Sequence, residues 1–477
     1  MRPIETLLIL YSFALLLRGV LAPNRGGGST VFFCVGLLLV LSAHVFFEGW
    51  RRPMLPTYLA VLLLCLSATF PLTRTGSAKV LIPISVAFLL LIGVATALIL
   101  PAIRLPSLQG PYRVAMTELL LPAPAVSGMP DRNALEHPPP HVRIWYPTSA
   151  QAPGPFDASF LRTRWRQLGT AAQPVYAVAD APLIAGPETL PILVYFPGWP
   201  GTQVENHALV RELVSQGSVV LSIEYPARVP GMSNAYYQAL VKELERPLYY
   251  GSEAMYKALV RIAEVRVHTR ATDASRALDA MTVLSAEEPG SRFYHRLDWQ
   301  RLGVVGFSLG GAVAAQAVYQ DPRYKAAINI DGRHWAETRE AGVARPYMML
   351  SEVLNMPTAA DLASPNLDWR YNAVEDTDDY TQLYRNLARH GGIHVTVNGT
   401  AHMSFTDKSL RSPWKRLTEG GPINGRRALR ITSDYVLAFF GKYLNGVDSP
   451  LLKNGSPRNY PEVDVRIYPA PPSADRE

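Results

Sequence analysis

Cysteine is almost missing from this 477-residue chain. Only Cys34 and Cys65 occur, and both fall within apolar runs near the N-terminus. This scarcity excludes a disulfide-stabilised scaffold. The remainder of the chain has no thiol, which excludes a cysteine nucleophile or a cysteine-bound metal there and leaves its redox compartment open.

Acidic residues are scarce in the first 104 positions, where only Glu5 and Glu48 occur. Eight basic residues accompany them, so this part carries a formal charge of +6, whereas the remainder has 38 basic and 37 acidic residues. The eight are Arg2, Arg18, Arg25, Arg51, Arg52, Arg74, Lys79 and Arg104. They flank apolar runs, so we interpret them as membrane-flanking charge. The nearly neutral remainder offers no basic field for DNA or RNA, and nucleic acid is not an expected partner.

Long apolar runs, by contrast, are abundant before residue 105. Four of them, 4–21, 31–47, 54–72 and 80–103, are each about 17 to 25 residues long, enough for a helix to cross a hydrocarbon core of about 30 Å. We predict four transmembrane helices that serve as an anchor, although the first run would also suit a signal peptide. His44 lies in the second run, where we interpret it as an interfacial or helix-facing residue rather than a functional group. Basic residues are divided evenly between the two sides, so the membrane face of the remainder stays open.

The remainder is expected to be a folded domain, since the composition of the chain, 48% hydrophobic and 18% charged, is that of a globular protein. Short apolar strands alternate with helical patterns from residue 110 onward. We expect strands at 141–146, 190–196, 218–224, 302–307, 326–330, 347–351 and 393–397, and helices at 205–216, 269–286, 311–320, 379–389 and 428–444. This alternation predicts an α/β fold with a mainly parallel sheet covered by helices on both faces. The ligand site of such a sheet lies at the carboxyl ends of its strands. Segment 122–140 is rich in proline and is expected to be a surface loop, and the tail after Pro469 is expected to fray.

The sharpest motif is GFSLG at residues 306–310, which follows one expected strand and opens the next helix. In a nucleophile elbow of this kind the glycines permit close backbone approach, and the hydroxyl of the central serine projects from the sheet edge. The same letters could mark a glycine-rich turn with a bystander serine. The strand before and the helix after favour Ser308 as a nucleophile.

A serine hydroxyl needs a neutral imidazole to take its proton and a carboxylate to orient that imidazole. In this fold the expected chain order is serine, acid, histidine. Asp331 leaves the carboxyl end of the strand at 326–330, and His402 lies in the loop after the strand at 393–397, which matches that order. Taken alone, Asp331 could equally be a turn-former or a helix cap, and a single loop histidine is more often structural than catalytic.

Three other histidines compete for the role of base. They are His390, His334, which is too near Asp331 in sequence, and His394, which lies inside an expected strand. We therefore predict His402 as the base.

The oxyanion of an ester intermediate also needs preorganised N–H donors. One should come from Leu309, the residue after the nucleophile, and the other from the loop after an earlier strand. That loop reads PGWPG at residues 197–201, and because proline has no N–H, Trp199 is the favoured donor, with Gly198 possible. The alternative is that this segment is merely a tight turn.

These motifs together resemble the type II platelet-activating factor acetylhydrolase family of α/β-hydrolases. The likeness covers about residues 110–444 and includes GPYRV at 110–114 and RIWYP at 143–147, which look like the family's opening strands. The resemblance implies that Ser308, Asp331 and His402, with the aromatic Phe405 shortly after it, match the family's catalytic positions. It also implies that Trp199 and Leu309 match the oxyanion donors.

The sequence departs from the family in three respects. Phe307 stands where many members have histidine, Pro197 and Gly198 replace a His-Gly pair, and four membrane spans are not part of the family's usual plan. The resemblance implies ester hydrolysis without a metal or other cofactor, often on lipid-like or short-acyl esters.

We also interpret segment 227–262 as a cap over an apolar acyl pocket, with ordinary helix packing as the alternative. The segment is rich in methionine and tyrosine, namely Met232, Tyr236, Tyr237, Tyr249, Tyr250, Met255 and Tyr256.

The sequence thus predicts a multi-pass integral membrane protein, in the cell membrane, with spans in 1–104 and an α/β-hydrolase domain in 105–477. The expected activity is that of a serine esterase or lipase that forms an acyl-enzyme, with a small-molecule or lipid ester as substrate. Two alternatives stay open: an acyltransferase with the same triad, and a catalytically silent binding protein of this fold.

Overall fold

The structure is a computed structural model that describes residues 1–21, 27–69, 76–120, 140–151, 177–199, 201, 205–225, 250–414 and 417–470, with five single residues between 233 and 242. The chain forms two compact units. One contains Met1–Arg104 with two short later segments, and the other contains nearly all of the rest. The expected loop at 122–140, apart from Pro140, and the tail from residue 471 lie outside the described residues.

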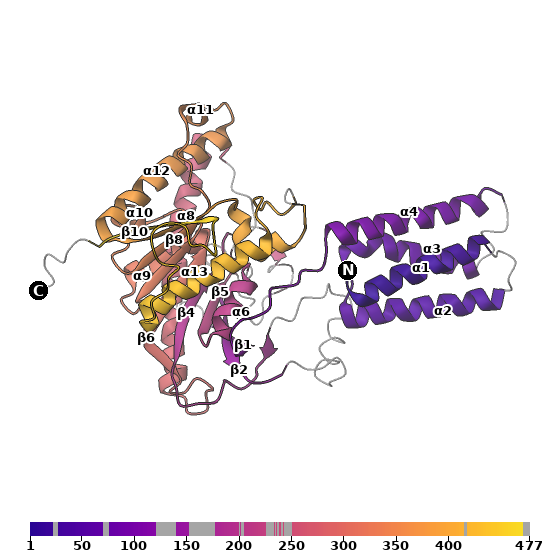
Figure 1. Cartoon of the computed structure of the whole chain (residues 1–477), viewed down its shortest axis with the longest axis horizontal. Coiled ribbons are helices and arrows are strands. Elements are labelled where there is room, and N and C mark those ends of the chain that lie inside the picture. The colour runs from indigo at the N-terminus through magenta and orange to yellow at the C-terminus, as the bar shows by residue number, and fades with distance from the viewer. Residues whose placement is uncertain are drawn as a thin grey trace, which may run out of the picture. The chain divides into compact units, whose positions relative to one another are not determined.

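The N-terminal unit consists of apolar helices (Figure 1). They are α1 (Pro3–Leu21), α2 (Gly27–Ala43) continued by the π-helical turn η1 (His44–Glu48), α3 (Leu55–Thr69) and α4 (Ala78–Ile99). Three helical stretches, Pro3–Leu21, Thr30–Glu48 and Ala78–Ile99, are long and apolar enough to cross a membrane, and a fourth apolar stretch, Arg52–Ala68, is shorter. The helices expected from the apolar runs are therefore present.

A polar network joins the ends of these helices. Glu5 accepts hydrogen bonds from Arg2 and Arg51, both at 2.8 Å, and Glu48 accepts the N–H of Glu5 at 3.0 Å. The ring of His44 contacts Glu48 at 3.0 Å and the Tyr58 hydroxyl of α3 at 2.8 Å. Glu5, His44 and Glu48 are the group of possible metal ligands found among the described residues. Both of their carboxylates already have cationic or N–H partners, so the network is explained as helix capping and ion pairing.

The second unit is built on one ten-stranded sheet. Its strands are β1 (Arg113–Leu120), β2 (His141–Thr148), β3 (Val178–Ala179), β4 (Leu190–Phe196), β5 (Val219–Glu224), β6 (Leu297–Phe307), β7 (Ala326–Ile330), β8 (Tyr347–Ser351), β9 (Gly392–Val397) and β10 (Val463–Tyr468). The spatial order is β10-β9-β8-β7-β6-β4-β5-β2-β1-β3. Strands β4 to β9 run parallel to one another, while β2 pairs antiparallel with β5 and β10 pairs antiparallel with β9. All seven expected strands are present, and the mainly parallel α/β sheet is confirmed.

Helices cover both faces of this sheet (Figure 1). They are α6 (His207–Ser215), α8 (Glu253–Ala286), α9 (Leu309–Gln320), α10 (Glu337–Ala341), α11 (Ala359–Leu362), α12 (Leu367–His390) and α13 (Gly425–Asn445). One buried core lies under α8, α9 and α12, with Val267 and Ala274 of α8 fully buried. The other lies under α6 and α13, where Val210 and Phe439 are fully buried. Because apolar side chains occupy both faces, the polar residues that could do chemistry are left at the strand ends.

Helix α8 begins earlier than the sequence indicates. We expected it to start at Thr269, but it starts at Glu253, where the Ser252 hydroxyl accepts the N–H of Met255 and caps it. The first turns carry polar and apolar residues without a clear stripe, so tertiary packing decides this start.

Candidate active site

Ser308 lies on a strained turn between β6 and α9. Its backbone dihedral angles are φ 55° and ψ −125°, which a residue with a Cβ rarely adopts. A Cβ on Gly306 would lie 1.9 Å from the Gly310 carbonyl oxygen, and one on Gly310 would lie 2.3 Å from the Phe196 oxygen. Both glycines are therefore needed for the close backbone approach that turns the Ser308 side chain out of the sheet.

Asp331 follows the neighbouring strand, β7, in a similarly tight turn with φ 54°. The buried side chain of Asn329 holds this turn from below through two hydrogen bonds to Gly332. The Oδ1 atom of Asp331 accepts the N–H of Glu352 at 2.9 Å, while Oδ2 faces His402. With only 4% of its side chain exposed, Asp331 is held in one orientation.

His402 begins the short helical turn η4 (His402–Phe405) after β9. Its Nδ1 lies 2.6 Å from Asp331 Oδ2, and its Nε2 lies 2.9 Å from Ser308 Oγ. Because the carboxylate accepts the Nδ1 proton, Nε2 is left to accept the Ser308 hydroxyl proton. The ring also packs on Phe307, with ring centroids 4.8 Å apart. The structure thus brings together the three residues selected from the sequence.

The environment of His402 favours its protonated form. Burial by itself would lower the pKa of the imidazole, but the hydrogen bond and charge of Asp331, with the charges of Glu352 and Glu205, outweigh it. The pKa of His402 is consequently raised above its ordinary 6.5. An imidazole of raised pKa is a stronger proton acceptor, as a general base for a serine requires.

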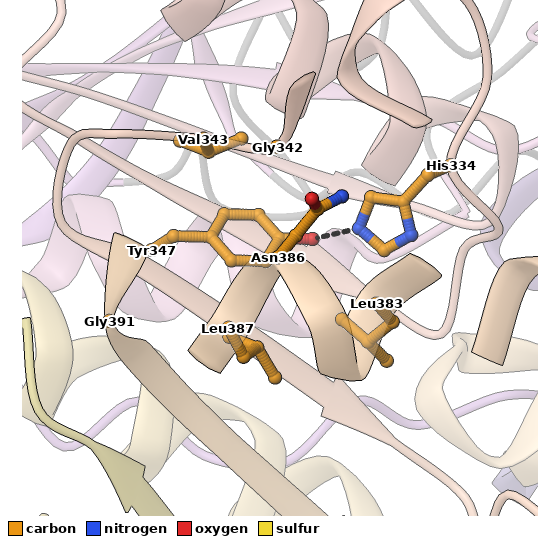
Figure 2. Close-up of a pocket in the computed structure, with 8 residues that line it drawn as sticks. All are labelled: His334, Gly342, Val343, Tyr347, Leu383, Asn386, Leu387 and Gly391. Carbon is orange, nitrogen blue, oxygen red and sulfur yellow. Dashed lines mark hydrogen bonds between the residues drawn. The ribbon is translucent and has the colours of Figure 1, made fainter. Parts of the chain in front are cut away.

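The competing histidines have other partners. His334 is buried, with Nδ1 3.0 Å from Asp379 Oδ1 and Nε2 2.7 Å from the Tyr347 hydroxyl. Figure 2 shows the contact between His334 and the Tyr347 hydroxyl, beside a small cavity between β8 and α12. His390 contacts the carbonyl oxygen of Ala341 at 2.7 Å.

The third competitor, His394, lies in β9 as expected and forms a second Ser–His contact, with Nε2 2.9 Å from Ser351 Oγ. The Ser351 hydroxyl donates to the Glu352 carbonyl, and burial lowers the pKa of His394 to about 4. Among the residues that the structure describes, no carboxylate contacts the His394 ring in the way that Asp331 contacts His402.

The loop after β4 passes beside Ser308. A Cβ on Gly198 would lie 3.1 Å from the Cβ of Ser308 and 3.0 Å from Glu205 Oε2. The Gly198 N–H points at the Glu205 carboxylate, where it opposes the rise in pKa that burial causes. Leu309 is the first residue of α9, so its N–H has no acceptor within the helix. The Gly198 N–H is thus engaged by Glu205, and the pairing of the Trp199 and Leu309 N–H groups around an oxyanion stays a prediction.

Two arginines of α8 lie behind that loop. The guanidinium of Arg266 lies 3.7 Å from the ring centroid of Trp199, a cation–π contact. A Cβ on Gly201 would lie 2.7 Å from an Arg270 nitrogen, so the loop also packs on Arg270. The Gly201 carbonyl accepts the N–H of Tyr225 at 2.6 Å, which ties the loop to the end of β5.

Asp407 connects the loop of His402 to helix α6. Its carboxylate accepts the N–H of His207 at 2.8 Å and of Ala208 at 3.2 Å, at the positive end of the helix. Its own N–H donates to the Glu205 carbonyl at 3.0 Å. Sequence reasoning overlooked Asp407, Glu205, Glu352 and Asn329. The position of Glu352 directly after a strand, like that of Asp331, was the one signal available.

The expected cap segment is described only in part. Met232, Tyr236, Tyr237 and Tyr249 lie outside the described residues. Tyr256 stacks on Tyr371 of α12 with centroids 4.7 Å apart, and its hydroxyl donates to Glu375, while Tyr250 packs edge-on against Tyr256. These aromatic side chains join the start of α8 to α12, which is helix packing, whereas Met255 is 41% exposed.

Comparison with known proteins finds one matching family and several similar proteins. The sequence profile of the family described as platelet-activating factor acetylhydrolase, isoform II, matches residues 144–450, well over half of the chain. Platelet-activating factor acetylhydrolase from Gallus gallus is 24% identical over 390 residues, covering 72% of this chain and 84% of that protein. A probable 1-alkyl-2-acetylglycerophosphocholine esterase from Arthroderma benhamiae is 23% identical, covering 57% of this chain and 65% of its own length.

A solved structure gives the same fold. A ferulic acid esterase from Streptomyces cinnamoneus superposes with a TM-score of 0.53 at 24% sequence identity. The match covers 76% of this chain and 98% of the esterase.

Proposed function

Because the chain belongs to the platelet-activating factor acetylhydrolase isoform II family, we propose that it is a membrane-anchored serine ester hydrolase working through an acyl-enzyme. The observation that carries the proposal is the continuous contact from Asp331 through His402 to Ser308, at 2.6 Å and 2.9 Å. Those distances are within hydrogen-bonding range before any substrate binds.

Each residue has one task in the proposed reaction. His402 Nε2 takes the Ser308 proton as Oγ attacks the ester carbonyl, and it then gives that proton to the departing alcohol. Asp331 holds the Nδ1 proton and stabilises the imidazolium. The N–H groups of Trp199 and Leu309 hold the negative oxygen of the tetrahedral intermediate. Water, activated by the same imidazole, then releases the acid and restores Ser308.

The substrate class we propose is lipid-like or short-acyl esters. Of the similar proteins, one is named as a platelet-activating factor acetylhydrolase and another as a probable 1-alkyl-2-acetylglycerophosphocholine esterase. The apolar N-terminal helices support anchoring in a membrane, which would hold the site near amphiphilic esters.

The test is hydrolysis of p-nitrophenyl acetate by the detergent-solubilised full chain, with labelling by a fluorophosphonate probe. We expect Ser308→Ala to lower kcat/KM by about 10³-fold or more and to abolish labelling, while the thermal unfolding temperature is retained. Ser351→Ala is the matched control, because Ser351 also contacts a histidine at 2.9 Å but lacks the carboxylate and the oxyanion loop. It should keep labelling and turnover. Labelling of Ser308→Ala at the wild-type rate would refute the proposal.

A further inference from the structure

Four neighbouring strands each end in a group that can carry or hold a proton. Ser308 follows β6, Asp331 follows β7, Glu352 follows β8, and His402 lies in the loop after β9. These strands are adjacent and parallel in the order β9-β8-β7-β6. To reach Ser308, the loop of His402 must cross the end of β8, which is where Glu352 stands.

The contacts of Glu352 agree with this placement. Its N–H binds Asp331 Oδ1 at 2.9 Å, on the same carboxylate whose other oxygen binds His402. The preceding residue, Ser351, is fully buried, and Glu352 itself is half-buried rather than free in solvent. The charged groups facing Glu352 are Asp331 at the end of β7, His402 in the loop after β9, and Asp376 of α12. Those facing His402 are Asp331, Glu352 and Glu205.

We propose that Glu352 is a second carboxylate beside the catalytic base, a positioning residue that stabilises the His402 imidazolium by its charge and takes over the acid's role when Asp331 is removed. The proposal rests on the proposed function, in which His402 carries the proton. No proton moves to Glu352: the Ser308 proton goes to Nε2, and Glu352 contributes negative charge beside the ring. Opposite charge within several Å favours the charged form of a base.

The protonation of Glu352 follows from its surroundings. Burial, together with repulsion from Asp331, raises its pKa to about 7, while His402 opposes the rise. Below that pH Glu352 is largely neutral and stabilises the His402 imidazolium little. Above that pH its carboxylate is charged and stabilises the imidazolium. The imidazolium formed in the reaction in turn favours ionised Glu352, so the effect grows in the transition state.

The experiment is a pH profile of kcat/KM on p-nitrophenyl acetate for the full chain and its variants. Glu352→Gln should lower the plateau by about 3- to 30-fold and move the acid limb to lower pH by about 0.5 to 1 unit. Glu352→Asp, which keeps the charge, should restore part of both. Glu288→Gln removes an exposed carboxylate elsewhere and should change neither. A purely structural role would lower the unfolding temperature without moving the acid limb.

A second arm uses the acid itself. Asp331→Ala leaves space for Glu352 to approach His402. In that variant, Glu352→Gln should lower kcat/KM by at least about a further tenfold, a larger factor than the same change causes in the wild type. An unmoved acid limb in folded Glu352→Gln, or no added loss in the double variant, would overturn the inference. If Glu352→Gln does not fold, the same two measurements are made with Glu352→Asp. They are the acid limb of the single variant and the loss of kcat/KM that Glu352→Asp adds to Asp331→Ala. Full activity in Ser308→Ala would instead sink the proposed function, so the two failures are distinguishable.

Discussion

The side-chain amide of Asn329 holds both backbone polar atoms of Gly332. Its Nδ2 donates to the Gly332 carbonyl at 2.8 Å, and its Oδ1 accepts the Gly332 N–H at 2.9 Å. The residue is fully buried, and the turn that it closes contains Asp331. The orientation of the acid is thus set by a neutral amide below the sheet edge.

Replacing Asn329 with alanine should harm both stability and catalysis. Loss of two buried hydrogen bonds should lower the free energy of unfolding by about 2 to 4 kcal/mol. The freed turn should also lower kcat more than it changes KM, because Asp331 would no longer be fixed against His402. Urea denaturation and steady-state kinetics measure the two effects. Unchanged kcat in a destabilised but folded variant would show that Asn329 supports the fold alone.

The loop beside Ser308 should not tolerate a single methyl group. In Gly198→Ala the added Cβ would lie 3.0 Å from Glu205 Oε2 and 3.1 Å from Ser308 Cβ, so the loop or these neighbours must move by a few tenths of an ångström. We expect kcat to fall by about 10- to 100-fold with little change in KM, since a displaced Trp199 N–H stabilises the oxyanion less. Gly290→Ala, whose Cβ would meet nothing within 4 Å, is the control. Equal kinetics for the two variants would argue against an oxyanion role for this loop.

Activity should depend on pH through His402. The reaction needs the neutral imidazole, and the pKa of His402 is raised above 6.5 mainly because Asp331 outweighs burial. kcat/KM should therefore rise with an apparent pKa above 6.5 and fall as pH drops through that value. Asp331→Asn, whose amide still fills the space that Asp331→Ala would open to Glu352, should move this limb to lower pH and lower the plateau by about 10⁴-fold. A limb below pH 6 in the wild type would contradict the assignment of His402 as the base.

The N-terminal helices should behave as an anchor. With three stretches long enough to span a bilayer, the full chain should stay with membranes after an alkaline carbonate wash and be released by detergent. Immunoblotting of the fractions checks this. Release by carbonate alone would show that the helices associate with the membrane surface or with each other.

The parts of the fold that local signals determine could be predicted from the sequence. Continuous apolar strands such as β7 and β8 have the predicted bounds, because a buried parallel strand leaves an unbroken run of apolar residues. The edge strand β10 was not predicted, since charged Asp464 and Arg466 interrupt it and pairing with β9 creates it.

The candidate site could likewise be predicted only in part. Ser308, Asp331 and His402 could be selected because each follows a strand in the order that this fold requires. Glu352 follows β8 by the same rule, but a lone carboxylate after a strand is common, and its nearness to His402 becomes visible only when the strands are placed side by side. The role of Asp407 depends on backbone N–H groups that lie 199 and 200 residues away, for which a sequence carries no local sign.

Asp407 fastens the base loop to the start of α6, the helix into which the Trp199 loop leads. Asp407 thus fixes the loop of the proposed base to the helix that follows the loop of the proposed oxyanion donor. A bulky acyl group that separated the His402 loop from the start of α6 would displace the proposed base and the proposed oxyanion donor together.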